Sequence, residues 1–245
     1  MYITETIKKP LTMRILSTLV GLLIFVSISA QDFYFTIYNF SVANEDVSTV
    51  YNLMDGYFSK NKLEGVTVTL YENHFSDSDN NFSHSVVFTG TSDALGAMYS
   101  RSQNSDWNLF LTQVNMHTDG FSSAMGRSIS GFGDNSTPHP VQKYFIFEAE
   151  DAAAYDAAYD AYNSKHNPDG RTTAMGTILS GHSDDGANRW VVNRFKDFKS
   201  AMEGPNSLRT EAENEASSKA WQERRNNQGG VRLVRSGLRI QLGQW

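Results

Sequence analysis

The chain has 245 residues, a formal net charge of −6 at neutral pH and no cysteine. The absence of cysteine excludes disulfide bonds, iron–sulfur clusters and thiolate zinc sites. The acidic balance gives no reason to expect nucleic acid as a partner, because phosphates require concentrated Lys and Arg. An apolar content of 40% is ordinary for a folded protein, and the length suits one large domain or two small ones.

The N-terminal segment predicts export. Lys8, Lys9 and Arg14 precede an apolar run that ends in small residues at Ala30, which is the pattern of a secretory signal peptide. The part that begins at Met13 is a complete signal peptide alone, so the true start could be Met13. An uncleaved anchor is the alternative, although the run is short for a bilayer. We expect residues 1–30 to be removed and the soluble remainder to be periplasmic or secreted, with no membrane contact after cleavage.

The first half of the chain predicts the order strand, helix, strand, strand, helix, strand. Alternating aromatic and β-branched residues indicate the strands, and apolar residues at helical spacing indicate the first helix, with Asn44–Asp46 as its cap. The expected ranges are strand 33–40, helix 47–58, strand 65–72, strand 82–90, helix 92–114 and strand 124–130.

The second half predicts the same order. Its clearest helix is alanine-rich and carries Tyr155, Tyr159 and Tyr162 on one side. A charged helix follows later, and Pro205 is expected to break or restart it. The expected ranges are strand 142–149, helix 151–165, strand 174–181, strand 189–195, a helix to about 226 and strand 231–243. The segment GDNSTPHP (133–140) has linker chemistry, so we expect units at 31–138 and 139–245.

Internal similarity supports a repeated architecture. SSAMGRSISGFGDN (122–135) matches RTTAMGTILSGHSDD (171–185) at an offset of 50, and TLYENHFSD (69–77) matches 177–185 more weakly at an offset of 108. Two βαββαβ units are two ferredoxin-like folds, each with a four-stranded antiparallel sheet. Each sheet alone leaves one face uncovered. We therefore predict an α+β protein whose two antiparallel sheets pack face to face as an α+β barrel.

This organisation resembles the dimeric α+β barrel superfamily in a fused, tandem form similar to antibiotic-biosynthesis monooxygenases. The resemblance is carried by AMGRSISG (124–131) with AMGTILSG (174–181), by NRWVVNRFKDF (188–198) and by YFIFEAEDAAAYDAA (144–158). It covers nearly all of residues 32–245. The superfamily includes cofactor-free monooxygenases, haem enzymes, isomerases and ligand sensors, and no catalytic motif of any member is matched. Fold alone does not decide among these functions.

Two histidines are the candidate catalytic residues. His74 and His182 each end the second strand of their unit, where they could act as general bases, metal ligands or haem contacts. The alternative is that each is a polar residue where the sheet meets water. DSDNN (77–81) resembles the start of a calcium loop but lacks the later Gly and Glu, so we expect no metal site.

Three aromatic residues are the candidate ligand-binding residues. Phe35, Tyr144 and Trp190 lie on predicted strands and could line an apolar pocket between the sheets. Core packing is the alternative for each of them. No other cofactor is expected, and haem is the exception that the resemblance leaves open.

Three functions remain open at this point. The leading hypothesis is an exported protein that binds a small apolar or aromatic ligand and has no catalytic motif. The second is a cofactor-independent or haem-linked monooxygenase-like enzyme, and the third is a structural protein whose barrel is filled by aromatic side chains. Oligomerisation is compatible with all three.

Overall fold

The computed structural model describes residues 33–76, 81–100, 104–181 and 185–245. Asp32–Trp245 form one compact unit. The predicted signal peptide, His182 and most of the DSDNN segment lie outside the described residues. No helix in the described ranges is long and apolar enough to cross a membrane.

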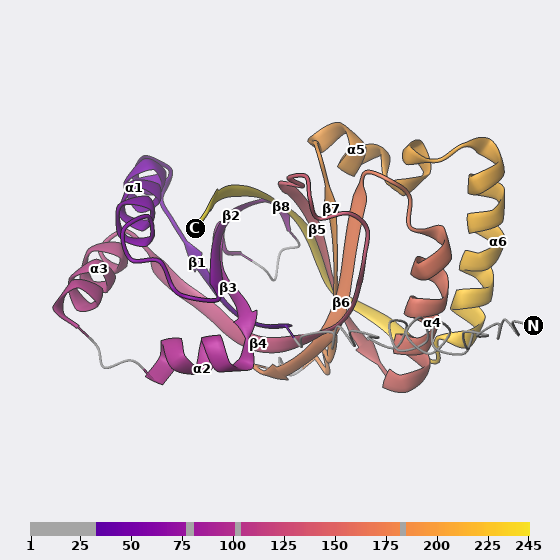
Figure 1. Cartoon of the computed structure of the whole chain (residues 1–245), viewed down its shortest axis with the longest axis horizontal. Helices are drawn as coiled ribbons and strands as arrows, with labels where there is room; N and C mark the ends of the chain where they lie inside the picture. The colour runs from indigo at the N-terminus through magenta and orange to yellow at the C-terminus, as the bar shows by residue number, and fades with distance from the viewer. Residues whose placement is uncertain (1–32, 77–80, 101–103, 182–184) are drawn as a thin grey trace, which may run out of the picture. The chain divides into compact units, whose positions relative to one another are not determined.

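Eight strands form one closed antiparallel barrel (Figure 1), in the order β1-β3-β2-β8-β5-β7-β6-β4. This confirms the α+β class and the tandem ferredoxin-like architecture, with four strands from each half. The strands are β1 (Phe33–Ser41), β2 (Val66–Ser76), β3 (His84–Thr91), β4 (Asp119–Phe132), β5 (Val141–Ala149), β6 (Arg171–Ser180), β7 (Arg189–Phe195) and β8 (Val231–Gln244).

The helices lie outside the barrel, and Figure 1 shows those of the first half and those of the second half over different strands. They are α1 (Val47–Phe58), α2 (Ser92–Ser100), α3 (Ser105–Asn115), α4 (Ala152–His166), α5 (Phe198–Glu203) and α6 (Glu211–Asn227), with 3₁₀ turns η1 (Asn44–Asp46) and η2 (Pro205–Leu208). The predicted boundary between 138 and 139 falls in the segment that joins β4 to β5.

Two predicted helices differ from the structure. The range 92–114 holds two helices. The second begins at Ser105 and is capped by Asn104, whose side chain accepts a hydrogen bond from the Trp107 backbone N–H at 2.8 Å. An internal cap of this kind starts a new helix. The predicted cap at Asn44–Asp46 is wrong, because these residues form η1 and make no side-chain cap. The Asp46 carboxylate instead lies 2.8 Å from His117 Nδ1.

The prediction that Pro205 interrupts the charged helix is confirmed. α5 ends before Gly204, and η2 starts at Pro205. α6 then begins with a capping box in which Thr210 and Glu213 satisfy each other's backbone N–H groups. The interruption places α6 beside α4 instead of in line with α5.

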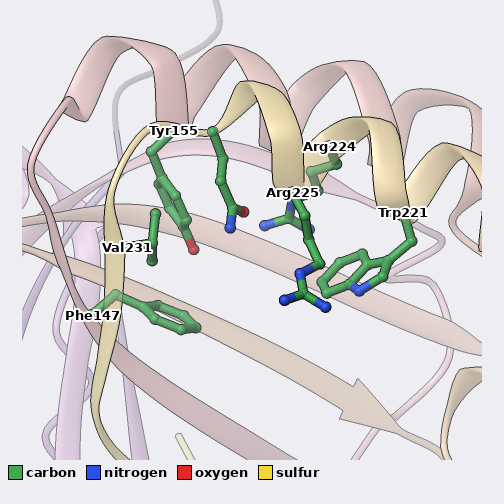
Figure 2. Close-up of a pocket in the computed structure, with 7 residues that line it drawn as sticks. Phe147, Tyr155, Trp221, Arg224, Arg225 and Val231 are labelled. Atoms are coloured by element: carbon green, nitrogen blue, oxygen red, sulfur yellow. The ribbon is translucent and has the colours of Figure 1, made fainter.

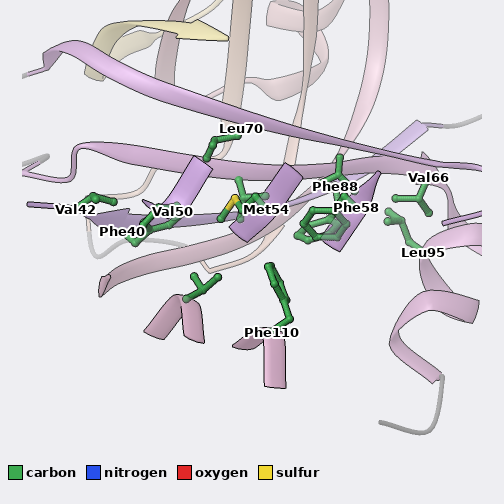
Figure 3. Close-up of a cluster of buried hydrophobic side chains, with 13 residues drawn as sticks. Phe40, Val42, Val50, Met54, Phe58, Val66, Leu70, Phe88, Leu95 and Phe110 are labelled. Carbon is green, nitrogen blue, oxygen red and sulfur yellow. The ribbon is translucent and has the colours of Figure 1, made fainter. Parts of the chain in front are cut away.

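Alternation along the strands separates a helix-covered outer face from the barrel interior. In the first half, apolar side chains of β1, β2 and β3 pack with α1, α2 and α3 in a cluster shown in Figure 3 that includes Val50, Phe58 and Phe88. In the second half, Met175 and Val191 pack outward with Tyr155 of α4. The intervening strand residues therefore face the interior.

The two AMG segments are neighbours in space. β4 and β6 pair antiparallel along one of the two seams that join the halves, with Gly126 opposite Ile178 and Ser128 opposite Gly176. The offset of 50 therefore relates two paired strands, whereas the weaker offset of 108 relates β2 to β6, which hold the same place in their units. The other seam pairs β2 with β8.

Glycine at the β4–β6 seam is required by close packing. A Cβ at Gly176 would lie 2.5 Å from the Trp190 ring and would collide with the Arg127 carbonyl oxygen. A Cβ at Gly126 would lie 2.5 Å from the Phe35 ring. A Cβ at Gly131 on the same seam would meet nothing closer than the Thr173 carbonyl oxygen at 3.5 Å.

The two seam positions predict opposite responses to alanine. Gly176→Ala is expected to lower the free energy of unfolding by about 1–3 kcal/mol, because overpacking forces neighbours to shift. Gly131→Ala is expected to leave it unchanged or slightly raised, because alanine loses less backbone entropy on folding. Urea unfolding of both variants is the measurement, and equal destabilisation by the two would contradict this view of the seam.

Candidate functional site

Two helices of the second half face each other through side chains at matched spacing. The first residues of both helices are set by side-chain caps, Asp151 for α4 and Thr210 for α6. The Tyr162 hydroxyl lies 2.7 Å from Ser217 Oγ, and the Tyr162 ring meets Trp221 edge to face at 5.2 Å. The facing residues are Tyr155, Tyr159 and Tyr162 on α4 and Ser217, Trp221 and Arg224 on α6.

A pocket of about 220 Å³ opens beside this contact, between the two helices and the outer face of β5 and β8. Figure 2 shows Trp221, Arg224 and Arg225 reaching it from α6, with Phe147 and Val231 opposite. The seven residues that line the pocket are Phe147, Tyr155, Trp221, Arg224, Arg225, Gln228 and Val231. The walls are therefore mainly aromatic and aliphatic, with two guanidinium groups and one amide.

Arg224 is surrounded by aromatic rings. Its guanidinium carbon lies 4.7 Å from the centre of the Trp221 ring and 5.1 to 5.9 Å from the rings of Tyr159, Tyr162 and Tyr155. Such contacts stabilise a cation through the negative faces of the rings. They do not satisfy all of its N–H groups: Arg224 Nε is buried without a hydrogen-bond partner among the described residues, and the Tyr155 hydroxyl is the polar group beside the guanidinium.

No described carboxylate neutralises Arg224. Asp156, on the facing helix, is held by Arg189 through two hydrogen bonds of 2.8 and 3.0 Å. Among the described residues, Arg224 forms no ion pair. A partly buried cation without a counter-ion is costly unless an anion reaches it.

Burial changes the acid–base properties of this site. Desolvation raises the pKa of Tyr155 to about 12, so its hydroxyl is protonated at neutral pH. Desolvation also lowers the pKa of Arg224, against the opposing effect of the tyrosines. Arg224 remains charged because the pKa of a guanidinium starts far above neutrality. The pocket therefore offers a cation and a neutral hydroxyl donor.

The predicted ligand-binding aromatics lie in the barrel interior, and none of them lines this pocket. Phe35 and Trp190 meet edge to face at 5.3 Å, each beside a seam glycine, and the Trp190 indole donates to the Thr177 carbonyl at 3.3 Å. Tyr144 is buried, and its ring centre lies 5.6 Å from the Arg239 guanidinium carbon. The structure thus joins Phe35 to Trp190 but places Tyr144 with a different partner.

Of the two predicted catalytic histidines, only His74 lies in the described part of the chain. His74 lies near the end of β2, with its Nε2 3.3 Å from Glu72 Oε2 and its side chain 38% exposed. His182 lies outside the described residues. His74 does not line the pocket, so its catalytic role stays a prediction.

Sequence reasoning missed Trp221, Arg224 and Arg225 as site residues. The segment up to about residue 226 was predicted only as a charged helix, although Trp221 and Arg224 are three residues apart and share one side of it. The sequence did show the tyrosines of α4 at helical spacing. Trp221 and Arg224 have a similar spacing on α6, and pairing these two helix faces was the signal that could have found the pocket.

The pocket does not fit a haem. None of the described histidines lines it. Tyr155 is the one lining residue of a type that ligates haem iron, and burial raises its pKa to about 12, which opposes the phenolate that iron would bind. The volume of about 220 Å³ is also below the roughly 300–1,000 Å³ typical of drug-sized ligands. No cluster of metal-binding side chains occurs among the described residues.

Comparison with solved structures shows the fold. A candidate monooxygenase from Fusobacterium nucleatum has a TM-score of 0.57 at 13% identity, with 88% of this chain and 94% of that chain covered. An anthrone oxidase-like protein has a TM-score of 0.53 at 11% identity, with 89% and 94% covered. A candidate chlorite dismutase has a TM-score of 0.52 at 8% identity, with 86% and 95% covered.

These likenesses confirm the dimeric α+β barrel fold that the sequence predicted. No protein-family model matches the chain, and no curated protein matches it. At such low identities the comparisons establish the fold and leave the chemistry to the residues of this chain.

A buried histidine next to His74 gives a pH-dependent stability. His84 is 2% exposed, its Nδ1 lies 2.8 Å from Ser83 Oγ, and its Nε2 has no hydrogen-bond partner among the described residues. Burial lowers the pKa of His84. The unfolded chain therefore binds more protons at this position, and stability falls as the pH drops below the unfolded value near about 6.5.

We expect His84→Gln to flatten this dependence. Between about pH 7.5 and about pH 5 the free energy of unfolding of the wild type should fall more than that of the variant, because the other titrating groups are common to both. Urea unfolding across this range is the measurement. Parallel pH profiles would show that His84 is not the titrating group.

Proposed function

We propose that this chain is an exported small-molecule-binding protein whose ligand is a flat aromatic compound with an acidic group. The observation that carries the proposal is the Arg224 guanidinium, which lies among four aromatic rings beside a pocket and has no described counter-ion. The ligand class follows from the two kinds of surface that meet there.

The acidic group is assigned to Arg224. A carboxylate or phenolate in the pocket accepts hydrogen bonds from guanidinium N–H groups that the rings do not satisfy. The Tyr155 hydroxyl, neutral at physiological pH, is available as a second donor. Arg225 and Gln228 line the same pocket and add further donors.

The aromatic part is assigned to the walls formed by Phe147, Trp221 and Val231. Aromatic rings pack favourably edge to face or offset against such walls. A cavity of about 150 Å³ accepts benzene, so a volume of about 220 Å³ suits a compound of one or two rings. The sequence predicted a small apolar or aromatic ligand between the sheets; the proposed ligand is aromatic but also acidic, and its pocket lies outside the barrel.

Binding is favoured over catalysis by the groups that line the pocket. A general base that works at neutral pH needs a pKa near 7. No described histidine or carboxylate lines the pocket, and the Tyr155 hydroxyl holds its proton to about pH 12. The monooxygenase-like alternative has the support of fold alone, through the names of the similar structures.

The filled-barrel alternative is compatible with this proposal. Phe35 and Trp190 occupy part of the barrel interior, whereas the pocket lies on the helix-covered face. Export rests on the sequence of residues 1–30. It predicts that the protein recovered from the periplasm or medium begins at Gln31, which mass spectrometry of the intact protein measures.

The ligand assignment predicts a selective loss of affinity. 1-Naphthoate is expected to bind the wild type more tightly than its neutral analogue 1-naphthamide. Arg224→Gln is expected to weaken naphthoate binding by roughly 10- to 100-fold, the usual worth of hydrogen bonds to a charged group. Isothermal titration calorimetry measures both ligands.

Lys219→Gln is the matched control, because it removes one positive charge from an exposed position of the same helix. It should leave naphthoate affinity unchanged. Equal weakening by the two variants would reduce the effect to net charge. The absence of saturable naphthoate binding to the wild type would overturn the proposal.

A further inference from the structure

Two arginines face the barrel interior from strands on either side of β5. Gln142 on β5 is paired with Arg194 on β7 and with Arg239 on β8, so the three residues form one row across adjacent strands. The row faces inward because the preceding residue on β5, Val141, packs outward with Phe195 and Leu238, and neighbouring residues of a strand point to opposite faces.

The spacing lets both guanidinium groups reach the space above Gln142. Neighbouring strands lie about 4.8 Å apart, so the backbones of Arg194 and Arg239 are separated by about 10 Å. Arginine side chains on one face at this separation can converge on a shared ligand. The Gln142 side chain between them is 1% exposed and its Oε1 accepts from Arg239 Nε at 2.6 Å.

Arg239 is buried and lacks an acidic partner among the described residues. It is 8% exposed, and its guanidinium carbon lies 4.2 Å from the centre of the Tyr71 ring and 5.6 Å from that of Tyr144. The ring faces attract the charge but accept few of its N–H groups. Its single hydrogen bond within the described residues is the one to Gln142.

Arg194 has the same deficit. It is half-buried, and its Nε is buried without a hydrogen-bond partner in the described part of the chain. Neither arginine belongs to an ion pair formed by described residues. The nearby positive charge of Arg194 also contributes to lowering the pKa of Arg239, after the larger effect of burial. Two like charges are thus held close in a poorly solvated interior.

Three other described arginines are neutralised by carboxylates, and the buried Arg171 is held by Asn163 and Asn167 instead. Arg189 is bound by Asp156, Arg232 by Glu148, and Arg235 by Asp185. These three ion pairs contrast with the Arg194–Gln142–Arg239 row, where the described neighbours are an amide and aromatic rings. Arg171 has amide acceptors for two of its nitrogen atoms, whereas Arg194 and Arg239 share one amide, which leaves donors for an anion from outside the chain.

We propose that the Arg194–Gln142–Arg239 row is an oxyanion-binding site inside the barrel. It is separate from the pocket that Trp221 and Arg224 line on the outer face, which is called the helix-side pocket below. Its ligand is a small doubly charged oxyanion, such as a dicarboxylate or a phosphate group. Each guanidinium can donate two hydrogen bonds to such a ligand in a planar fork. The Gln142 amide adds a neutral donor between them. The ligand proposed for the pocket beside α6 carries one acidic group, whereas the two arginines of the row call for two negative charges. The two sites therefore bind different compounds.

The test measures the affinity of the protein for malonate and for inorganic phosphate at constant ionic strength. Malonate represents dicarboxylates, and phosphate represents phosphate groups. The wild type should bind at least one of them at a single site by isothermal titration calorimetry, and its Tm should rise at concentrations too low for a general salt effect.

Arg194→Gln should lower that affinity at least tenfold. Arg194 is chosen for this test because it is only half-buried, so its replacement is less damaging to folding than replacement of the buried Arg239. Lys219→Gln is the matched control, because it removes one positive charge from an exposed position outside both sites, and it should bind as the wild type does. Absence of binding to the wild type, or equal loss in Arg194→Gln and Lys219→Gln, would overturn the assignment.

Discussion

Two seams of paired strands, β4 with β6 and β2 with β8, close the barrel, and this closure decides which residues face its interior and which pack under helices. Each half supplies a four-stranded sheet whose edges, β2 and β4 in one half and β6 and β8 in the other, would be left unpaired alone. Open edges are a liability because their N–H and C=O groups lack partners. Pairing β4 with β6 and β2 with β8 removes both edges at once.

Closure also creates two different environments from one alternating pattern. Outward residues pack under helices, and inward residues meet those of the opposite wall. Seam glycines then become a packing requirement, because Phe35 and Trp190 lie against the backbones of Gly126 and Gly176. The same alternation places Arg194 and Arg239 inside, and it places Phe147 outside beneath α4 and α6.

Local patterns were sufficient to predict the order of strands and helices. Alternation in FYFTIYNF and tyrosines at helical spacing in α4 depend on residues close in sequence, and they predicted β1 and α4 closely. The break at Asn104 was missed because a single capping residue decides it. Which strands pair in space was harder to predict from the sequence. The AMG repeat suggested strands in equivalent places of the two units, whereas β4 and β6 are paired with each other.

The candidate site was the least predictable feature, since it depends on contacts across 55 to 70 residues of sequence. Tyr162 meets Ser217, and Tyr155 lies with Arg224, because Pro205 ends one helix and Thr210 starts another beside α4. In the sequence Arg224 is one of many charged residues of α6, and nothing local distinguishes it from those that face solvent. His74, one of the two histidines that the sequence singled out, does not line this pocket.

A crystal structure of the protein with bound 1-naphthoate would show whether Arg224 and the rings around it bind an aromatic acid. We expect density for the naphthalene ring beside Trp221 and Phe147, with the carboxylate within hydrogen-bond distance of Arg224. Density for naphthoate inside the barrel against Phe35 and Trp190, with the helix-side pocket empty, would contradict it.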